Sequence, residues 1–196
     1  MFTSPKLAGT EGVLEINTLA MGSLVCKNLH IEFKDGMVTD YTCDNFEDEE
    51  ENKKFIKRSF MGHHDTVPMG EFAIGTNTTA YAVGEKYGIN AKFSGLIAEK
   101  TGPHFALGDT CFSWREDHAI YNPDGKEMIA RDNEVSILRK EEVTKAYMSC
   151  HSDLTIPYKE LDYIRVIKKD GSEISIIEDG RFVLPGTEEL NKALDE

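Results

Sequence analysis

The stretch that decides the fold is Gly70-Glu-Phe-Ala-Ile-Gly-Thr-Asn77, a short apolar run between glycines. Two similar runs follow, Leu96-Ile-Ala98 and Phe105-Ala-Leu107, and residues 70–110 as a whole are rich in Gly, Ala and Thr. Short apolar runs bounded by glycine predict buried strands or turns at which the backbone approaches another group closely. We therefore expect such strands or turns across this region.

Alternating apolar and polar residues on both sides of this region predict further strands. The alternating segments are residues 12–18, 24–33, 37–41, 163–168, 173–178 and 181–184. Lys34-Asp-Gly36 and Lys169-Asp-Gly171 are turn signals between neighbouring segments, so the first group predicts a hairpin and the last three segments a meander.

Helical segments are fewer than strands. Residues 47–61 predict a helix, because they begin with acidic residues and end with basic ones, as the helix dipole favours. Residues 78–88 and 188–194 predict two short helices, whereas residues 134–148 mix strand and helix signals. The pattern predicts an α+β fold with a mostly antiparallel or mixed sheet and a few helices, in one domain over residues 1–196.

Composition limits the classes of partner. The 196 residues carry a net charge of −13, which repels phosphate backbones, so we expect no nucleic-acid partner. The chain shows no apolar run of the roughly 20 residues that a membrane span needs and no signal-peptide pattern at its start. The four cysteines form no CxxC pair, and reduced thiols in a cytoplasmic protein are the simplest interpretation.

The clearest candidate for chemistry is His151-Ser-Asp153, at the start of an apolar run. Residues two apart in an extended chain point to the same face, so an imidazole and a carboxylate converge there. Both groups are good ligands for zinc, manganese or cobalt. The alternative is a structural His–Asp pair at the end of a strand.

Two glutamates and a second histidine extend this candidate site. Glu99 and His104 bracket Lys-Thr-Gly-Pro, a tight turn across which they can face one another; the alternative is polar residues on a surface loop. Glu71 lies among apolar and small residues, where a buried carboxylate is costly unless it is paired or bound to metal. An exposed position at the edge of a strand remains the alternative for Glu71.

Other histidines carry weaker signals. Adjacent side chains on a regular element point apart, so His63 and His64 cannot both join one site; His64 or Asp65 would at most support the ligands. His30 in a strand and His118 in a polar loop are expected to be structural or solvent-facing. The chain contains no GxSxG, Walker A or GxGxxG motif, so the sequence suggests no other catalytic apparatus.

Three motifs in order, Gly70 to Asn77, Glu99 to Gly108 and His151-Ser-Asp153, together resemble the thermophilic metallo-aminopeptidase family. The turn at Phe33-Lys-Asp-Gly36 and the segment Ile177 to Arg181 also look like family features. The resemblance extends over essentially the whole chain, which matches the C-terminal part of the family. Members are dinuclear-metal exopeptidases, often dimeric.

The resemblance implies a role for each candidate residue. Glu71, His104, His151 and Asp153 match metal ligands of the family, with Glu71 in a bridging place. Glu99 matches a glutamate that is either a ligand or the base that accepts a proton from water. The implied activity is hydrolysis of the N-terminal peptide bond of a peptide substrate by metal-activated water, with two divalent ions (Zn, Co or Mn) as cofactors.

Three departures from the family pattern qualify this expectation. We expect no counterpart of the family's large N-terminal domain in these residues, and Met1-Phe-Thr-Ser-Pro5 resembles a family segment that follows a further ligand glutamate. Cys111 stands where the family has a tyrosine, and the segment from Trp114 to Ser149 is longer than usual. The comparison predicts a truncated or weakly active form.

Two alternatives to an aminopeptidase remain open from the sequence. One is a non-catalytic metal-binding or assembly domain on the same scaffold. The other is a ring-cleaving dioxygenase of related fold, which needs a single iron with open positions instead of two metals. Metal stoichiometry and turnover of an aminoacyl substrate distinguish the three.

Overall fold

The structure is a computed structural model that describes residues 2–21, 23–112, 119–121, 123–128 and 131–195. A central antiparallel sheet has the strand order β1-β5-β6-β9. Its strands are β1 (Phe2–Thr3), β5 (Met69–Ile74), β6 (Pro103–Gly108) and β9 (His151–Thr155). Strands β5 and β6 arise from the glycine-bounded runs, so the expectation of buried strands there is confirmed.

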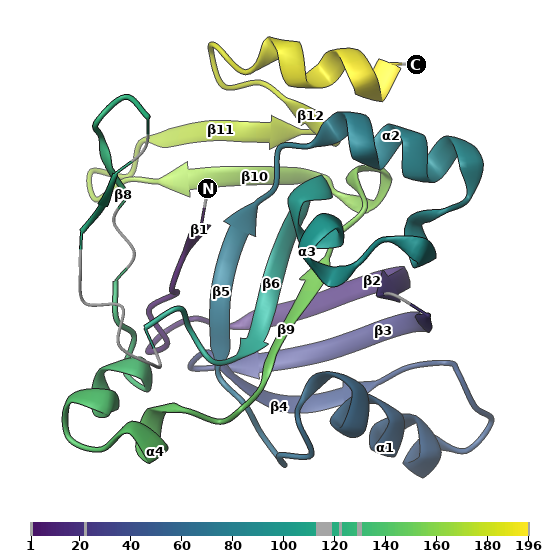
Figure 1. Ribbon diagram of the computed structural model, residues 1–196, viewed down its shortest axis with the longest axis vertical. Coiled ribbons are helices and arrows are strands. Elements are labelled where there is room, and N and C mark those ends of the chain that lie inside the picture. The colour runs from purple at the N-terminus through teal and green to yellow at the C-terminus, as the bar shows by residue number, and fades with distance from the viewer. Residues whose placement is uncertain (1, 22, 113–118, 122, 129–130, 196) are drawn as a thin grey trace.

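A second sheet lies across one end of the central sheet (Figure 1). It is the meander β2 (Gly12–Met21), β3 (Leu24–Lys34) and β4 (Met37–Thr42), with Asp35 and Gly36 at positive φ in the turn. Its inward residues, among them Ile16 and Ile31, form the larger core together with the central strands. The predicted hairpin is confirmed, although β2 and β4 run past the predicted ends.

Helix α1 (Glu49–Phe60) covers this second sheet with Ile56 and Phe60, which are fully buried. The Asp48 side chain accepts a hydrogen bond from the Glu51 N–H at 3.0 Å and so begins the helix. Acidic residues in the first turn and Lys57 and Arg58 in the last turn follow the helix dipole, as the sequence indicates.

The C-terminal part forms a third sheet at the opposite end of the molecule (Figure 1). Its strands are β10 (Tyr163–Ile167), β11 (Glu173–Glu178) and β12 (Arg181–Phe182), so the predicted meander is confirmed, with a last strand shorter than expected. Ile177 and Phe182 form a smaller core with Ile74 and Tyr158, against which α2 (Thr78–Tyr87) packs Tyr81. The C-terminal turn of helix, η5 (Glu188–Asp195), contributes Leu190 and Leu194 to it.

The remaining elements are short. They are η1 (Asn90–Lys92), α3 (Gly95–Ala98), η2 (Glu99–Thr101), β7 (Ile120–Tyr121), β8 (Glu127–Met128), η3 (Ser136–Lys140), α4 (Val143–Ala146) and η4 (Tyr158–Glu160). The predicted strand or turn at Leu96-Ile-Ala98 is helical instead, and Leu96 is 77% exposed. Apart from that segment, the structure confirms an α+β fold with antiparallel sheets and few helices.

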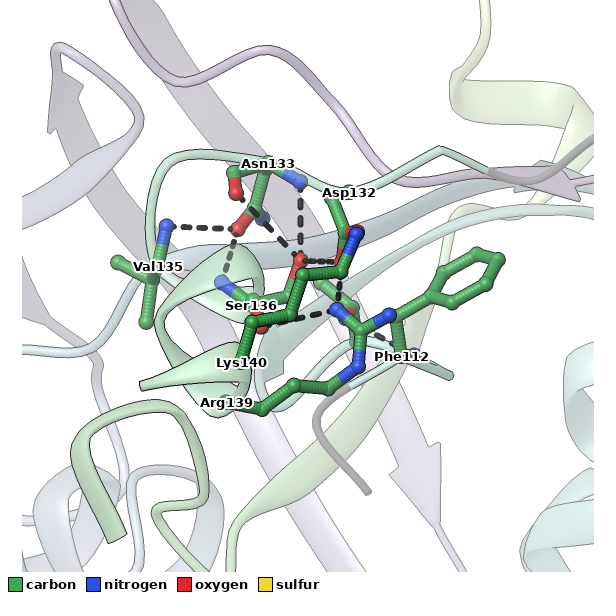
Figure 2. A network of polar contacts seen from close by, with 8 residues as sticks. Phe112, Asp132, Asn133, Val135, Ser136, Arg139 and Lys140 are labelled. Atoms are coloured by element: carbon green, nitrogen blue, oxygen red, sulfur yellow. Dashed lines mark hydrogen bonds and ion pairs between the residues drawn. The ribbon is translucent and has the colours of Figure 1, made fainter. Parts of the chain in front are cut away.

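A polar network forms around the start of η3 (Figure 2). The buried Arg139 guanidinium pairs with Asp132. The Asp132 carboxylate also accepts a hydrogen bond from the Ser136 hydroxyl at 2.9 Å. Next to this network, the Glu134 carboxylate accepts the N–H groups of Leu7 and Ala8 at 2.8 and 3.0 Å. These contacts hold the N-terminal segment beside β5 and so complete the central sheet.

Candidate metal centre

The candidate site lies on one face of the central sheet, and strand register puts it there. Side chains at directly paired positions share a face, and so do alternate residues along a strand. Three rows therefore cross this face: Gly108–His151, Glu71–Ala106–Asp153 and Ala73–His104–Thr155. Small residues between the ligand-type side chains leave space above the sheet, since Gly108, Ala106 and Ala73 have little or no side chain.

The opposite face of the same strands belongs to the protein interior. Leu107 and Leu154 are fully buried there, and Phe105 packs against the larger core. The Phe72 and Phe105 rings lie 5.2 Å apart. Burial of this apolar face fixes the register, because a slip by one residue would exchange it with the polar face. The position of the candidate ligands therefore depends on packing behind the sheet.

Both histidines are oriented by backbone carbonyl groups. His104 Nδ1 lies 3.1 Å from the Gly102 oxygen, and His151 Nδ1 lies 2.6 Å from the Asp109 oxygen. If each Nδ1 donates its proton, each Nε2 carries a free lone pair that faces the carboxylates. This arrangement is typical of metal-binding histidines, whose second nitrogen is held by an oxygen acceptor.

Glu71 and Asp153 lie between the two histidines. Glu71 Oε1 is 3.6 Å from His104 Nε2, and its Oε2 is 3.7 Å from His151 Nε2. Asp153 Oδ1 is 3.3 Å from His151 Nε2 and 3.9 Å from His104 Nε2. Two ligands of one tetrahedral ion stand about 3.4 Å apart when each lies about 2.1 Å from the metal. The observed separations are close to this value.

Glu99 reaches the site from η2, which lies over the sheet. The Ala98 carbonyl accepts the hydroxyls of Thr101 and Thr155 at 2.7 and 3.3 Å, which fixes the start of η2 above β9. Gly75 lets this segment approach β5, because a Cβ there would lie 2.5 Å from the Glu99 carbonyl oxygen. Tight packing against β5 and β9 therefore places the Glu99 side chain, which is only 13% exposed.

The ligand-type atoms form two groups that share one residue. Glu71, His151 and Asp153 make the first group, and Glu99, His104 and Asp153 the second; within each, the atoms lie within 4.8 Å of one another. Asp153 Oδ1 is shielded from solvent, and its neighbour His151 Nε2, at 3.3 Å, is not aligned to donate a hydrogen bond to it. A buried carboxylate oxygen without an aligned donor fits a position that a cation occupies. Imidazoles and carboxylates suit zinc, cobalt or manganese.

The electrostatics of the site favour positive charge. The Asp153 carboxylate and the acceptor at Asp109 raise the pKa of His151 to about 9 against the opposing effect of burial. Burial is the largest single effect on the pKa of His104 and lowers it, but Glu71, the Gly102 carbonyl and Asp153 together outweigh it, so the net shift is upward. Burial opposes ionisation of Asp153, yet the neighbouring His151 holds the pKa of that carboxyl below its ordinary value. A proton and a metal ion therefore compete for His151.

This competition predicts a pH-dependent response to metal. The raised pKa of His151 stabilises the metal-free fold fully below about pH 6.5, and that contribution is lost as pH rises through about 9. Metal binding needs neutral imidazole, so it releases protons and strengthens as pH rises. We expect the increase in Tm on adding Co²⁺ to be larger at pH 9 than at pH 6, measured by thermal unfolding with and without chelator. An equal increase at both pH values would contradict this assignment of His151.

The weaker candidates lie outside the site. His64 Nε2 contacts the Met148 carbonyl oxygen at 2.9 Å, Asp65 pairs with Lys57 at the protein surface, and His30 lies between Glu15 and Glu32. His118 lies outside the described residues. The contacts described for His64 and Asp65 involve none of the five candidate ligands, so a supporting role for either residue stays a prediction.

Neither nearby cysteine is an obvious ligand. The Cys150 Sγ points away from the site and donates to the Phe60 carbonyl at 3.3 Å, and burial raises the pKa of this thiol. Cys111 is partly buried two residues beyond Asp109. A protonated, buried thiol behaves as a small hydrophobic group.

Sequence reasoning missed Asp109, which supports the site. Its carbonyl orients His151, and its carboxylate accepts the N–H groups of Met148 and Cys150 at 2.7 and 3.2 Å. Asp109 thus shapes the chain just before the His-x-Asp motif. The one sequence signal was its place directly after the Gly108 that closes the Phe105 run, which alone does not distinguish it from a turn residue.

Comparison with known proteins agrees with the fold. No protein-family model matches the chain, and a comparison with curated proteins finds no match. Among solved structures, the chain is similar to wild-type AmpT from Thermus thermophilus, with a TM-score of 0.58 and 21% sequence identity. The match covers 93% of this chain and 39% of the AmpT chain, so this chain shares the fold of a part of AmpT.

The structure places no membrane-spanning helix in the described part of the chain. Every helix there is too short or too polar to cross the apolar layer of a bilayer.

Proposed function

We propose that this chain is the metal-binding part of a metal-dependent aminopeptidase that removes N-terminal residues from peptides. The observation that carries the proposal is the convergence of two histidine Nε2 atoms on Glu71 and Asp153 over one sheet face, with Glu99 above them. The ordered resemblance of the three motifs to the thermophilic metallo-aminopeptidases supports the reaction class, and the shared fold with AmpT supports the scaffold.

Four residues would serve only as metal ligands, and Glu99 would serve both as a ligand and as a proton acceptor. Glu71, His151 and Asp153 would hold one divalent ion, and His104, Glu99 and Asp153 a second. When bound, such ions lower the pKa of a water molecule and polarise the carbonyl of the scissile peptide bond. Because a carboxylate positioned near such a water can act as a general base, Glu99 would accept its proton at Oε2, the oxygen that Lys100 does not contact.

Three carboxylates favour hydrolysis over oxygenase chemistry at this site. Glu71, Glu99 and Asp153 offer three carboxylates beside the two imidazoles, a donor set that matches two hard or borderline divalent ions. A single iron with open positions typically uses two histidines and one carboxylate. The donor set therefore favours the dinuclear hydrolase over the dioxygenase.

Replacement of Glu99 by glutamine tests the proposed reaction. The amide keeps the shape of the side chain but is a far weaker base, so we expect kcat on a leucyl chromogenic anilide to fall by about 100-fold or more. The ion held by Glu71, His151 and Asp153 should remain, as metal analysis would show. Glu85→Gln is a matched control, since Glu85 also pairs with a lysine, Lys159 at 2.6 Å, outside the site.

The same assay separates the two remaining functions. Turnover in the wild-type chain that Glu99→Gln abolishes supports the aminopeptidase. Metal binding without turnover of any aminoacyl anilide would show a non-catalytic metal-binding domain. We expect slow turnover, because Cys111 stands where the resembled family has a tyrosine.

A further inference from the structure

Lys100 places a positive charge at the edge of the candidate metal centre. Its Nζ lies 2.5 Å from Glu99 Oε1, although the lysine side chain is 64% exposed and comes from the rim of the site. Glu99 belongs to the group with His104 and Asp153, so this ammonium contacts one of the oxygens that a metal ion at that group would need. The ammonium contacts the second group directly and acts on Glu71 and Asp153 of the first group only through weaker, longer-range attraction.

The backbone of Lys100 is fixed, so its contact with Glu99 follows from the fold. The Lys100 carbonyl accepts the Asn77 N–H at 2.9 Å. A Cβ on Gly75 would lie 2.5 Å from the same carbonyl, so β5 and η2 are pressed together there. With the lysine anchored next to Glu99 in this turn, its ammonium has a short path to the carboxylate.

Charge balance gives this contact a consequence. Three carboxylates line the site, and one divalent ion together with the Lys100 ammonium neutralises them. A second divalent ion adds positive charge to a balanced site, and it must also take Glu99 from the lysine. The ammonium and a second metal ion repel each other, and this repulsion weakens binding because Glu99, which both would contact, is largely shielded from water.

We propose that Lys100 makes the two metal positions unequal: the Glu71–His151–Asp153 group binds its ion first and tightly, and the Glu99–His104–Asp153 group binds weakly until Lys100 leaves Glu99. This inference rests on the proposed function, because it concerns the same metal centre. It makes Lys100 a positioning residue that regulates metal loading. Full loading of the site would then depend on a substrate or a second ion that displaces the ammonium.

The test measures metal affinity, not activity. Co²⁺ is titrated into the metal-free full chain by calorimetry, with wild type, Lys100→Met and Lys100→Arg compared. We expect Lys100→Met to tighten the second binding event by about 10-fold and to leave the first within about 2-fold. Lys100→Arg keeps the charge and should behave as wild type. The second event should disappear in His104→Ala.

Lys159→Met is the matched control. Lys159 pairs with Glu85 at 2.6 Å and is 62% exposed, so this variant removes the same charge from a similar ion pair outside the site. It should leave both binding events unchanged. Circular dichroism would confirm that each variant is folded before titration.

The outcomes separate the inference from the function on which it rests. A second event of equal affinity in wild type and Lys100→Met overturns the role of Lys100 but leaves the metal centre intact. If wild type and Lys100→Met each bind only one ion, the role of Lys100 is also overturned, while the metal centre stays. Absence of any binding in the folded wild type overturns the metal centre itself, and with it both proposals.

Discussion

Replacing Asp153 with alanine is expected to abolish binding of both divalent ions. Asp153 belongs to both groups of ligand-type atoms, whereas each histidine belongs to one. Loss of a residue that only supports a ligand already costs about 10- to 100-fold in metal affinity, so loss of a shared ligand should cost more than about 100-fold. Calorimetric titration with Co²⁺ or Zn²⁺ measures the effect directly.

Asp40→Ala is a suitable control for this variant. Asp40 is also a strand aspartate and pairs with Lys53 at 3.0 Å, but it lies on β4, away from the central sheet. The Asp40→Ala variant removes the same charge as Asp153→Ala and should leave the affinities for both metal ions unchanged. Retention of tight binding at both positions in Asp153→Ala would show that this residue is no ligand.

Replacing Gly108 with alanine is expected to be the most destabilising single change near the site. Gly108 has φ of +100°, and a Cβ there would overlap the carbonyl oxygen of Cys150, the residue just before the paired strand β9. Strain of this kind costs about 1–3 kcal/mol, and the backbone overlap adds to it, so we expect a loss of at least about 3 kcal/mol. Because Gly108 pairs with His151, separation of β6 and β9 would also weaken metal binding.

Substitutions at two other glycines separate the cost of backbone strain at positive φ from the cost of steric overlap. Gly88 also has positive φ, +61°, but a Cβ there meets no atom within 4 Å, so Gly88→Ala should cost only about 1 kcal/mol. Gly95→Ala in α3 introduces neither strain at positive φ nor steric overlap, so it should be neutral or slightly stabilising. Urea unfolding of the three variants gives the comparison. Equal stabilities would contradict the proposed close packing at Gly108.

Sequence patterns predicted most strands because alternation and turn residues are local signals. Strands β2, β3 and β4 and the C-terminal meander follow from them directly. The failure at residues 96–98 has a physical reason: a short apolar run does not distinguish a buried strand from an exposed helical turn. Here Leu96 and Ile97 are exposed, and the helical turn that contains them leads directly into the turn that carries Glu99.

The candidate site was predictable in part. The spacing of His151 and Asp153 alone places both on one face of a strand, as the structure has them. Their convergence with Glu71 and His104 depends on strand pairing across more than 40 residues, for which the sequence offers only a resemblance. Lys100 was not singled out, because a lysine beside a glutamate is more often part of a solvated surface.

Anomalous diffraction from a crystal of the wild-type chain soaked in Co²⁺ is the most direct test of the metal centre. We expect an anomalous peak in contact with the carboxylate of Asp153 and flanked by Glu71 and His151. A weaker second peak is expected beside His104 and Glu99. Cobalt bound elsewhere, with no peak at Asp153, would contradict the assignment of these five residues to one metal centre.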